Sequence, residues 1–184
     1  WSTGIIKLYN TLSADFLYKK ANNNVTFLDN HDMTRIHSSL GESIAKTKMA
    51  YAWLYTCRGI PQLYYGSEVL MKGISNPDGW VRLDFPGGWQ DDKKNAFTET
   101  GLTNEESDFL HYVQTLGAFR TKSSALKTGN MMQYIPEDGL YVYFRYDNKQ
   151  SVMIVMNTDT KTRNVNMSNY AERTSAYKGG KEII

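Results

Sequence analysis

The chain has 184 residues and carries 21 Lys and Arg against 19 Asp and Glu, a formal net charge of +2. This length suits one ordinary domain, or a partial domain with a small one beside it. The near-balanced charge, without a basic stripe, argues against nucleic acid as a main partner.

The sequence contains neither a membrane-spanning segment nor a recognisable targeting segment. No apolar run approaches the about 20 residues that span a bilayer, so no membrane partner is expected. No signal peptide is visible. The chain starts at Trp1 without an initiator Met, so we expect an excised or processed segment of a longer protein.

Cys57 is the single cysteine of the chain, which excludes an internal disulfide. It lies in an apolar stretch with no His or Asn beside it, so a buried small hydrophobe is expected rather than a nucleophile. Aromatic residues make up 13% of the chain. This share favours a well-packed core, with platforms for sugar rings as the alternative.

The first part of the chain has the pattern of a parallel α/β fold. Apolar residues recur at helical spacing over residues 4–21, and a short β-rich run follows at 25–28. After a loop at 29–41, a second helix is expected over 42–57. A tight turn and another short buried strand are expected within 59–66. Strand, helix and strand with short links form the repeating unit of parallel α/β folds.

A long loop is expected over residues 67–101, and loops of this length in a compact domain are usually functional or disordered. Thr103 and Glu106 then form a capping box that opens a helix ending near residue 119. After residue 121 the pattern changes to short β-rich runs with turn signals between them. Four antiparallel strands are expected, over 131–135, 140–146, 152–157 and 162–167. We therefore predict two domains, residues 1–122 and residues 123–184.

Polar side chains of four consecutive residues, Asp29, Asn30, His31 and Asp32, come directly after the expected strand at 25–28. In parallel α/β barrels, side chains at the carboxyl ends of strands form the active site. The alternative is a polar turn in which Asp32 caps a short helix at residues 33–35. The spacing alone leaves these two interpretations equal.

A resemblance to a known family favours the active-site interpretation over the polar turn. Residues 27–32, FLDNHD, are similar to the fourth signature region of the α-amylase family, F-x-x-N-H-D, and Thr34 and Arg35 fit its continuation. Residues 59–68, GIPQLYYGSE, resemble the last barrel strand of that family. The similarity continues through 76–89 and is closest to bacterial neopullulanases and cyclomaltodextrinases. It implies the C-terminal part of a (β/α)8 TIM barrel followed by a small antiparallel β-sandwich.

The same resemblance implies roles for the residues of the motif. The family performs retaining glycoside hydrolysis between carboxylates. Asp32 matches its third catalytic acid, which holds ring hydroxyls and stabilises developing positive charge. His31 matches a histidine that binds hydroxyls of the sugar being cleaved. Asn30 is expected to orient its neighbours, and we group it and Arg35 with the substrate-binding residues.

Asp78 and Arg82 lie four residues apart and resemble an Asp/Arg pair that grips the next sugar toward the non-reducing end. The residues between them differ from the family pattern. The alternative is a surface ion pair worth at most about 1 kcal/mol. For Trp80 and Trp89, stacking on a sugar ring and packing within the loop are the two alternatives. His37 and His111 are isolated and are expected to be packed or solvated rather than catalytic.

The patterns that carry the family's nucleophile Asp and general acid Glu are not found in this chain. Because hydrolysis needs both groups, we predict that the isolated chain is inactive. The parent is expected to cleave α-1,4 bonds, with α-1,6 bonds as an extension, in starch-derived glucans or cyclodextrins. One alternative is a non-catalytic module that binds carbohydrate or a partner on the same fold; another is an unrelated α/β domain with a chance motif.

The remaining expectations concern ligands and assembly. No cofactor is expected: no metal-ligand cluster has convincing spacing, and the calcium that family members often bind is usually held by parts absent here. The expected partner is an α-glucan oligosaccharide. Because a partial barrel has unpaired edges, three outcomes are expected as alternatives: self-association into a homo-oligomer, swapping of elements, or survival as a trimmed remnant of a larger protein. Between the bacterial periplasm and cytoplasm, the resemblance favours the periplasm.

Overall fold

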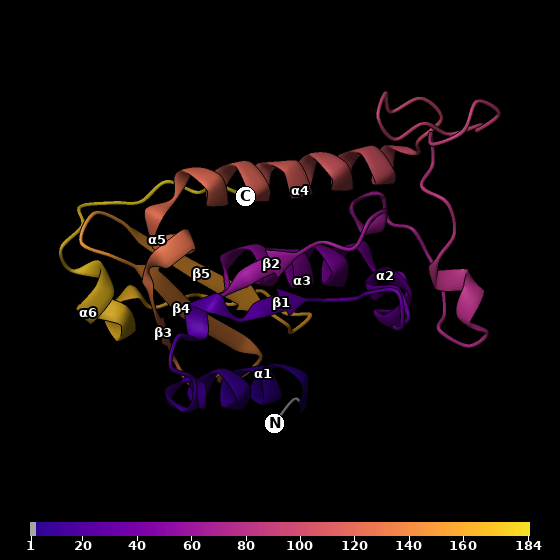
Figure 1. The fold of residues 1–184 in the computed structure, drawn as a ribbon. Coiled ribbons are helices and arrows are strands. Elements are labelled where there is room, and N and C mark those ends of the chain that lie inside the picture. Colours follow the sequence, from indigo (N-terminus) through magenta and orange to yellow (C-terminus); the bar gives the residue numbers. More distant parts are fainter. Residues whose placement is uncertain (1–2) are drawn as a thin grey trace. The chain divides into compact units, whose positions relative to one another are not determined.

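The computed structural model describes residues 3–184, shown as a ribbon in Figure 1. The chain forms two compact units, each described here by itself. The unit that we call the barrel unit comprises Asn24–Tyr55 and Gly59–Lys122. The unit that we call the C-terminal unit comprises the segment ending at Asn23, Thr56–Arg58 and Ser123–Ile184. None of the helices within residues 3–184 is long and apolar enough to cross a bilayer.

The barrel unit begins with strand β1 (Val25–Phe27), short helix α2 (Ile36–Ser39), helix α3 (Ile44–Thr56) and strand β2 (Ile60–Gln62). The two strands pair in parallel, with Val25 opposite Ile60. This confirms the predicted order of strand, helix and strand. Helix α2 lies within a segment that was expected to be loop.

The turn before β2 requires a glycine. Gly59 has a φ of 103°, and a Cβ there would lie 2.5 Å from the Asn24 carbonyl oxygen. That close approach lets the Ile60 amide donate to the same oxygen at 2.9 Å. Arg120 reaches the turn from the end of helix α4 and donates to the Gly59 carbonyl at 2.5 Å and, in α3, to the Tyr55 carbonyl at 2.7 Å. The start of the second strand is thereby fixed from two sides.

Helix α4 (Asn104–Lys122) opens with the predicted capping box. The Thr103 amide donates to Glu106 Oε2 at 2.8 Å, and the Glu106 amide donates to Thr103 Oγ1 at 3.2 Å. These bonds satisfy two of the amides that a helix start leaves unpaired. The core of the barrel unit lies mainly between α3 and α4, and its buried members are Tyr51, Leu54, Leu70, Phe109, Val113 and Leu116.

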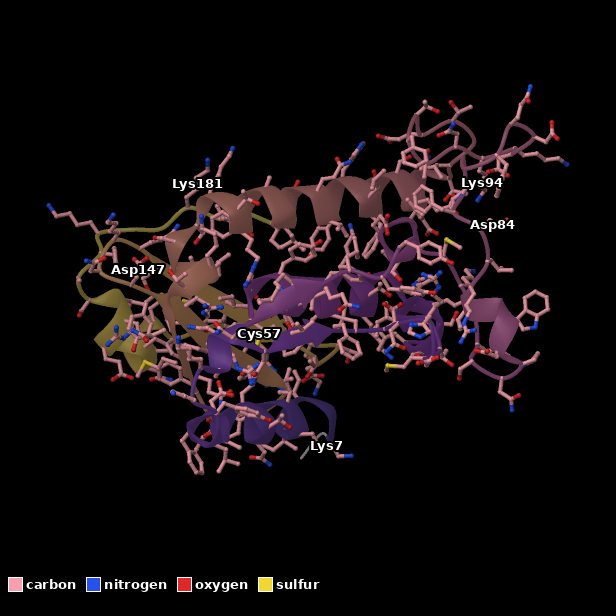
Figure 2. The ribbon with its side chains drawn as sticks, viewed as in Figure 1. Lys7, Cys57, Asp84, Lys94, Asp147 and Lys181 are labelled. Carbon is pink, nitrogen blue, oxygen red and sulfur yellow. The ribbon has the colours of Figure 1, made fainter. Side chains whose placement is uncertain are left out.

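The segment between β2 and α4 is largely loop, as expected. It contains two short 3-10 turns, η3 (Ser67–Val69) and η4 (Asp78–Val81). Figure 1 shows this segment extending beyond the start of α4, and Figure 2 marks Asp84 and Lys94 on it. Local hydrogen bonds shape the loop: Asp92 accepts from the amides of Gly87 at 2.8 Å and Trp89 at 3.1 Å.

The C-terminal unit is built on a three-stranded antiparallel sheet in the order β3–β4–β5. Its strands are β3 (Asn130–Gln133), β4 (Leu140–Tyr146) and β5 (Ser151–Asn157). The helical elements of this unit are α1 (Thr3–Ser13), η1 (Asp15–Leu17), η2 (Ala21–Asn23), α5 (Ser124–Thr128), η5 (Met167–Tyr170) and α6 (Ala171–Thr174).

Two sequence expectations for this unit are corrected. The helix expected over residues 4–21 ends at Ser13, and the 3-10 turns η1 and η2 follow in place of its second half. The fourth strand expected over 162–167 does not form. Instead, Asp159 accepts from Arg163 Nη2 at 2.6 Å, and Asn166 caps η5. These turn contacts take the place of a strand pairing.

Strand β4 is buried on both faces. Tyr141 and Tyr143 point to one side and Phe144 to the other, where it packs with Tyr170. The Tyr143 hydroxyl lies 2.5 Å from Thr56 Oγ1. Cys57, marked in Figure 2, is buried as predicted, and burial raises the pKa of its thiol to about 11. Such a thiol stays protonated at neutral pH and is a poor nucleophile.

Candidate active-site corner

Asp29 stands at the carboxyl end of β1 and is buried. Its Oδ2 accepts from the Ile36 amide at 2.8 Å and from the Ser67 hydroxyl at 2.8 Å. The carboxylate therefore fixes the start of α2 and the start of η3 to the end of the strand. Residues 33–35 are not helical, so the alternative in which Asp32 caps a helix there is wrong.

Arg35 lies beneath the motif, with a side chain that is 0% exposed. Its guanidinium carbon lies 4.2 Å from the ring centre of Tyr64 and 4.9 Å from that of Tyr65. Its Nη1 donates to the Tyr65 carbonyl and, at 3.2 Å, to Ser67 Oγ. A guanidinium stacked on aromatic rings and bonded in this way is an internal brace. The predicted contact of Arg35 with substrate finds no support in this geometry.

Asn30, His31 and Asp32 form the exposed part of the motif. The Asp32 amide donates to Asn30 Oδ1 at 2.9 Å, so Asn30 holds the backbone of its neighbour. His31 Nε2 lies 3.3 Å from Asp32 Oδ2, with the two side chains 63% and 65% exposed. Both side chains are open to a ligand from solvent.

Arg82 connects this motif with a distant part of the chain. Its Nε donates to the His31 carbonyl at 3.0 Å, and its Nη2 lies 3.2 Å from Asp32 Oδ1. The same Nη2 lies 3.2 Å from Asp78 Oδ1. One guanidinium thus joins two carboxylates separated by 46 positions in sequence, and Asp78 and Arg82 are more than an isolated surface pair. We call the group Asn30, His31, Asp32, Asp78 and Arg82 the corner.

Two tyrosines hold the segment that carries Arg82. The Tyr64 hydroxyl donates to the Val81 carbonyl at 3.2 Å, and the Tyr65 hydroxyl donates to the Leu83 carbonyl at 2.9 Å. These bonds flank Arg82 on both sides, while the rings of both tyrosines lie against Arg35. The buried brace and the exposed corner are therefore mechanically linked through Tyr64 and Tyr65.

Sequence reasoning missed this support. Ser67, which bonds to both Asp29 and Arg35, carried no signal beyond its place after the strand. The adjacent Tyr64 and Tyr65 lie within the motif at 59–68, which assigns them no bracing role. Their shared role depends on hydrogen bonds to carbonyls 17 and 18 residues further along the chain, which no local pattern reveals.

The other singled-out side chains lie outside the corner. His37 is buried and its Nδ1 lies 2.9 Å from Thr47 Oγ1, while His111 pairs with Glu99 at 2.8 Å. Trp89 donates to Asp84 Oδ2 at 3.1 Å and its ring remains largely exposed, as does that of Trp80. Within residues 3–184 no group of three or more His, Cys, Asp or Glu is arranged to hold a metal ion.

The corner has a defined chemical capacity. Exposed carboxylate and guanidinium groups bind vicinal hydroxyls through charge-assisted hydrogen bonds. Asp32 presents negative charge, which suits a developing positive charge. Within the corner, Asp78 is the other carboxylate, and Arg82 is bonded to both. The arrangement can bind a sugar and stabilise charge on it.

Comparison with known proteins shows the family to which the chain belongs. The profile of the alpha amylase catalytic domain matches residues 3–109. The chain belongs to the α-amylase family. A second profile, that of the cyclo-malto-dextrinase C-terminal domain, matches residues 131–184. Both matches confirm the predicted resemblance.

Individual relatives agree. A cyclomaltodextrin glucanotransferase from Bacillus sp. (strain 1011) is 30% identical over 145 residues, which is 79% of this chain and 18% of that protein. Alpha-amylase 3 from Dictyoglomus thermophilum is 30% identical over 161 residues, covering 78% of this chain and 32% of that protein. The chain therefore spans between about a fifth and a third of these relatives.

A solved structure supports the fold class. The crystal structure of an Anoxybacillus α-amylase superposes with a TM-score of 0.67 at 27% identity, covering 85% of this chain and 32% of that one. In this family fold, β1 and β2 are neighbouring strands of the (β/α)8 barrel, and the sheet β3–β4–β5 is the C-terminal antiparallel module. The predicted fold class is confirmed.

Proposed function

We propose that this chain supplies the substrate-clamping and charge-stabilising corner of a retaining α-glucan hydrolase. The observation that carries the proposal is Arg82, which joins Asp32 to Asp78. In this proposal Asp32 holds ring hydroxyls of the sugar being cleaved and stabilises its oxocarbenium character. His31 binds the same sugar, and Asp78 with Arg82 binds the next one.

We assign the buried residues a positioning role. Asp29 and Arg35 are buried and do not face the solvent from which a ligand would bind. Their hydrogen bonds hold the end of β1, α2 and η3 in one geometry. Charge stabilisation depends on groups that are fixed before the reaction begins. A displacement of the corner by about 1 Å is enough to lower turnover strongly. Arg35 is therefore a positioning residue in this proposal and not a ligand of the sugar.

The nucleophile and the general acid are assigned to sequence outside these 184 residues. The isolated chain is then expected to bind glucans weakly and to show no turnover of starch or cyclodextrin. Turnover by the isolated chain would contradict this assignment. We also retain the two-domain division at residues 122 and 123 as a proposal, together with the neopullulanase-like type and a periplasmic location in a bacterium.

The test uses the full-length protein. Replacing Asp32 by Asn removes its charge with little change of shape, and a loss of about 10²–10³ in kcat is expected, as for other groups that stabilise transition-state charge. The matched control is Asp91→Asn in the same unit, which removes an equal charge from an exposed loop. Arg82→Gln is expected to raise KM for longer glucans and to lower kcat. Equal activity of Asp32→Asn and the control would overturn the proposal.

A further inference from the structure

A cavity of about 460 Å³ is lined only by residues of the C-terminal unit. Its walls come from segments far apart in sequence: Asp15 with residues 20–23, Arg58 just after α3, and residues 127–131 at the junction of α5 and β3. Small-molecule sites usually occupy about 300–1,000 Å³. The cavity therefore has room for a small molecule and not only for a single ion.

Arg58 is the fixed cationic group of this cavity. Its side chain is 8% exposed, and it donates from Nε and Nη2 to the two carboxylate oxygens of Asp15, at 2.7 Å and 2.5 Å. This paired contact holds the planar guanidinium in one orientation. Its third nitrogen, Nη1, has no hydrogen-bond partner within residues 3–184 and is not sealed from solvent. Arg58 thus retains one oriented donor group that a ligand can reach.

Two lysines add positive charge to the same cavity. Lys20 and Lys127 line it from opposite parts of the sequence, and both are exposed. Neither forms an ion pair with a carboxylate of residues 3–184. A single exposed lysine attracts an anion only weakly, because water screens its charge. Here two unpaired ammonium groups share one cavity with an oriented guanidinium, so their attractions act on the same ligand.

The balance of charge defines the class of ligand. Arg58, Lys20 and Lys127 stand against one carboxylate among the described lining residues, that of Asp15. The excess of two positive charges favours a dianion over a monocarboxylate or a neutral sugar. A phosphate monoester carries close to two negative charges at neutral pH and offers three acceptor oxygens. Guanidinium and ammonium groups are the side chains that bind such oxygens best.

The rest of the cavity wall suits a polyol attached to the phosphate. The side-chain amides of Asn22, Asn23 and Asn130 line the cavity and make no hydrogen bond with residues 3–184. An amide both donates and accepts, and hydroxyl groups need both. Since the volume exceeds what one phosphate fills, these amides are available to the remainder of a larger ligand.

We propose that this cavity binds a phosphate dianion, either free or as the monoester of a small polyol such as a sugar phosphate. The phosphate oxygens accept from Arg58 Nη1 and from the ammonium groups of Lys20 and Lys127. The corner belongs to the barrel unit, so this proposal does not rest on the proposed function. A ligand that binds only the folded chain also stabilises it. The site would therefore make the stability of the C-terminal unit respond to phosphate compounds.

The test is a calorimetric titration of the 184-residue chain with inorganic phosphate, glucose-6-phosphate and glucose. Both phosphate compounds are expected to bind saturably, and glucose is expected not to bind in the cavity. The double variant Lys20→Gln with Lys127→Gln should weaken both phosphate compounds about tenfold, because two charge-assisted hydrogen bonds are lost. The matched control is Lys149→Gln with Lys161→Gln, which removes an equal charge from exposed positions of the same unit outside the cavity.

The two phosphate compounds distinguish the source of the phosphate. Tighter binding of glucose-6-phosphate assigns the site to a phosphorylated sugar, and equal binding assigns it to free phosphate. A shift of the Arg58 Nε–H resonance during NMR titration with either compound is expected to locate the ligand. Absence of saturable phosphate binding, equal weakening by the two double variants, or an Arg58 resonance that does not move would overturn the proposal.

Discussion

Strand β4 of the C-terminal unit and strands β1 and β2 of the barrel unit differ in how far their side chains are buried. All five residues from Tyr141 to Arg145 in β4 are buried. In β1 and β2 the ends are exposed, with Val25 53%, Phe27 43% and Ile60 53% accessible. Parallel strands normally have both faces covered. The C-terminal unit therefore completes its sheet with its own residues, while the barrel unit presents apolar strand surface.

The largest effect is expected in the complete sheet. Phe144→Ala removes a fully buried ring from β4, and a loss of about 3–5 kcal/mol of unfolding free energy is expected. Hydrogen exchange of peptides covering β3, β4 and β5 measures it. Val155→Ala, on an exposed position of β5, is the control and should change little. Unchanged protection in Phe144→Ala would remove the contrast between the two units.

The second prediction concerns the brace in the barrel unit. Arg35→Lys keeps the charge but loses the planar group that stacks on Tyr64 and Tyr65. A loss of about 2–3 kcal/mol is expected, because hydrogen bonds to a charged group are broken in a buried place. Urea unfolding monitored by tryptophan fluorescence measures it. The exposed Arg82→Lys serves as control, at about 0–1 kcal/mol; equal effects of the two changes would contradict the brace.

The third prediction is a pH dependence. The Thr47 hydroxyl donates to the Ser43 carbonyl at 2.9 Å, so it accepts from His37, and the Nδ1 of His37 therefore carries a proton. Burial, followed by the charge of Lys72, lowers the pKa of His37. Its contribution to stability is complete above the unfolded value of about 6.5. That contribution is lost as the pH falls through the lowered folded value.

Melting temperatures of the wild type and of His37→Gln between pH 7.5 and pH 5 give the measurement. The wild type should lose stability on acidification more steeply than the variant, since Gln does not titrate. The exposed His111→Gln should follow the wild-type curve more closely than His37→Gln does. Parallel curves for wild type and His37→Gln would show that this histidine is not held neutral by its surroundings.

The smallest effect on stability is expected where the strands are exposed. The double variant Val25→Thr with Ile60→Thr should change unfolding free energy by no more than about 0.5 kcal/mol, because these side chains lie open to solvent. It should nevertheless lower self-association, which remains a prediction for this chain. Sedimentation velocity over a range of concentrations measures this, with Val155→Thr as control. A monomeric wild type at every concentration would contradict it.

Local patterns predicted most of the fold. The parallel strand–helix–strand order, the capping box of Thr103 and Glu106, and three strands of the C-terminal sheet all depend on neighbours within one element. The helix break at Ser13 and the missing strand at 162–167 were not predictable in this way. In the second case, side-chain bonds such as that between Asp159 and Arg163 compete with regular structure, whereas no local contact of Ser13 accounts for the end of the first helix.

The site shows the same division. Chemistry-bearing residues such as Asp32 and Arg82 were visible because their types and spacing form a motif. The burial of Arg35 was not visible, because a charged residue beside a polar motif is indistinguishable in sequence from an exposed one. Only the return of residues 64–67 against it reveals the brace. Sequence thus identifies the groups that face the ligand better than the groups that hold them.

The single guanidinium of Arg82 couples two of the proposed roles. On the proposed roles, Asp32 governs the rate of bond cleavage and Asp78 the choice of neighbouring sugar, and both are bonded to Arg82. A substitution that redirects Arg82 toward a new glucan also alters the environment of Asp32. Preference and turnover therefore change together at this position.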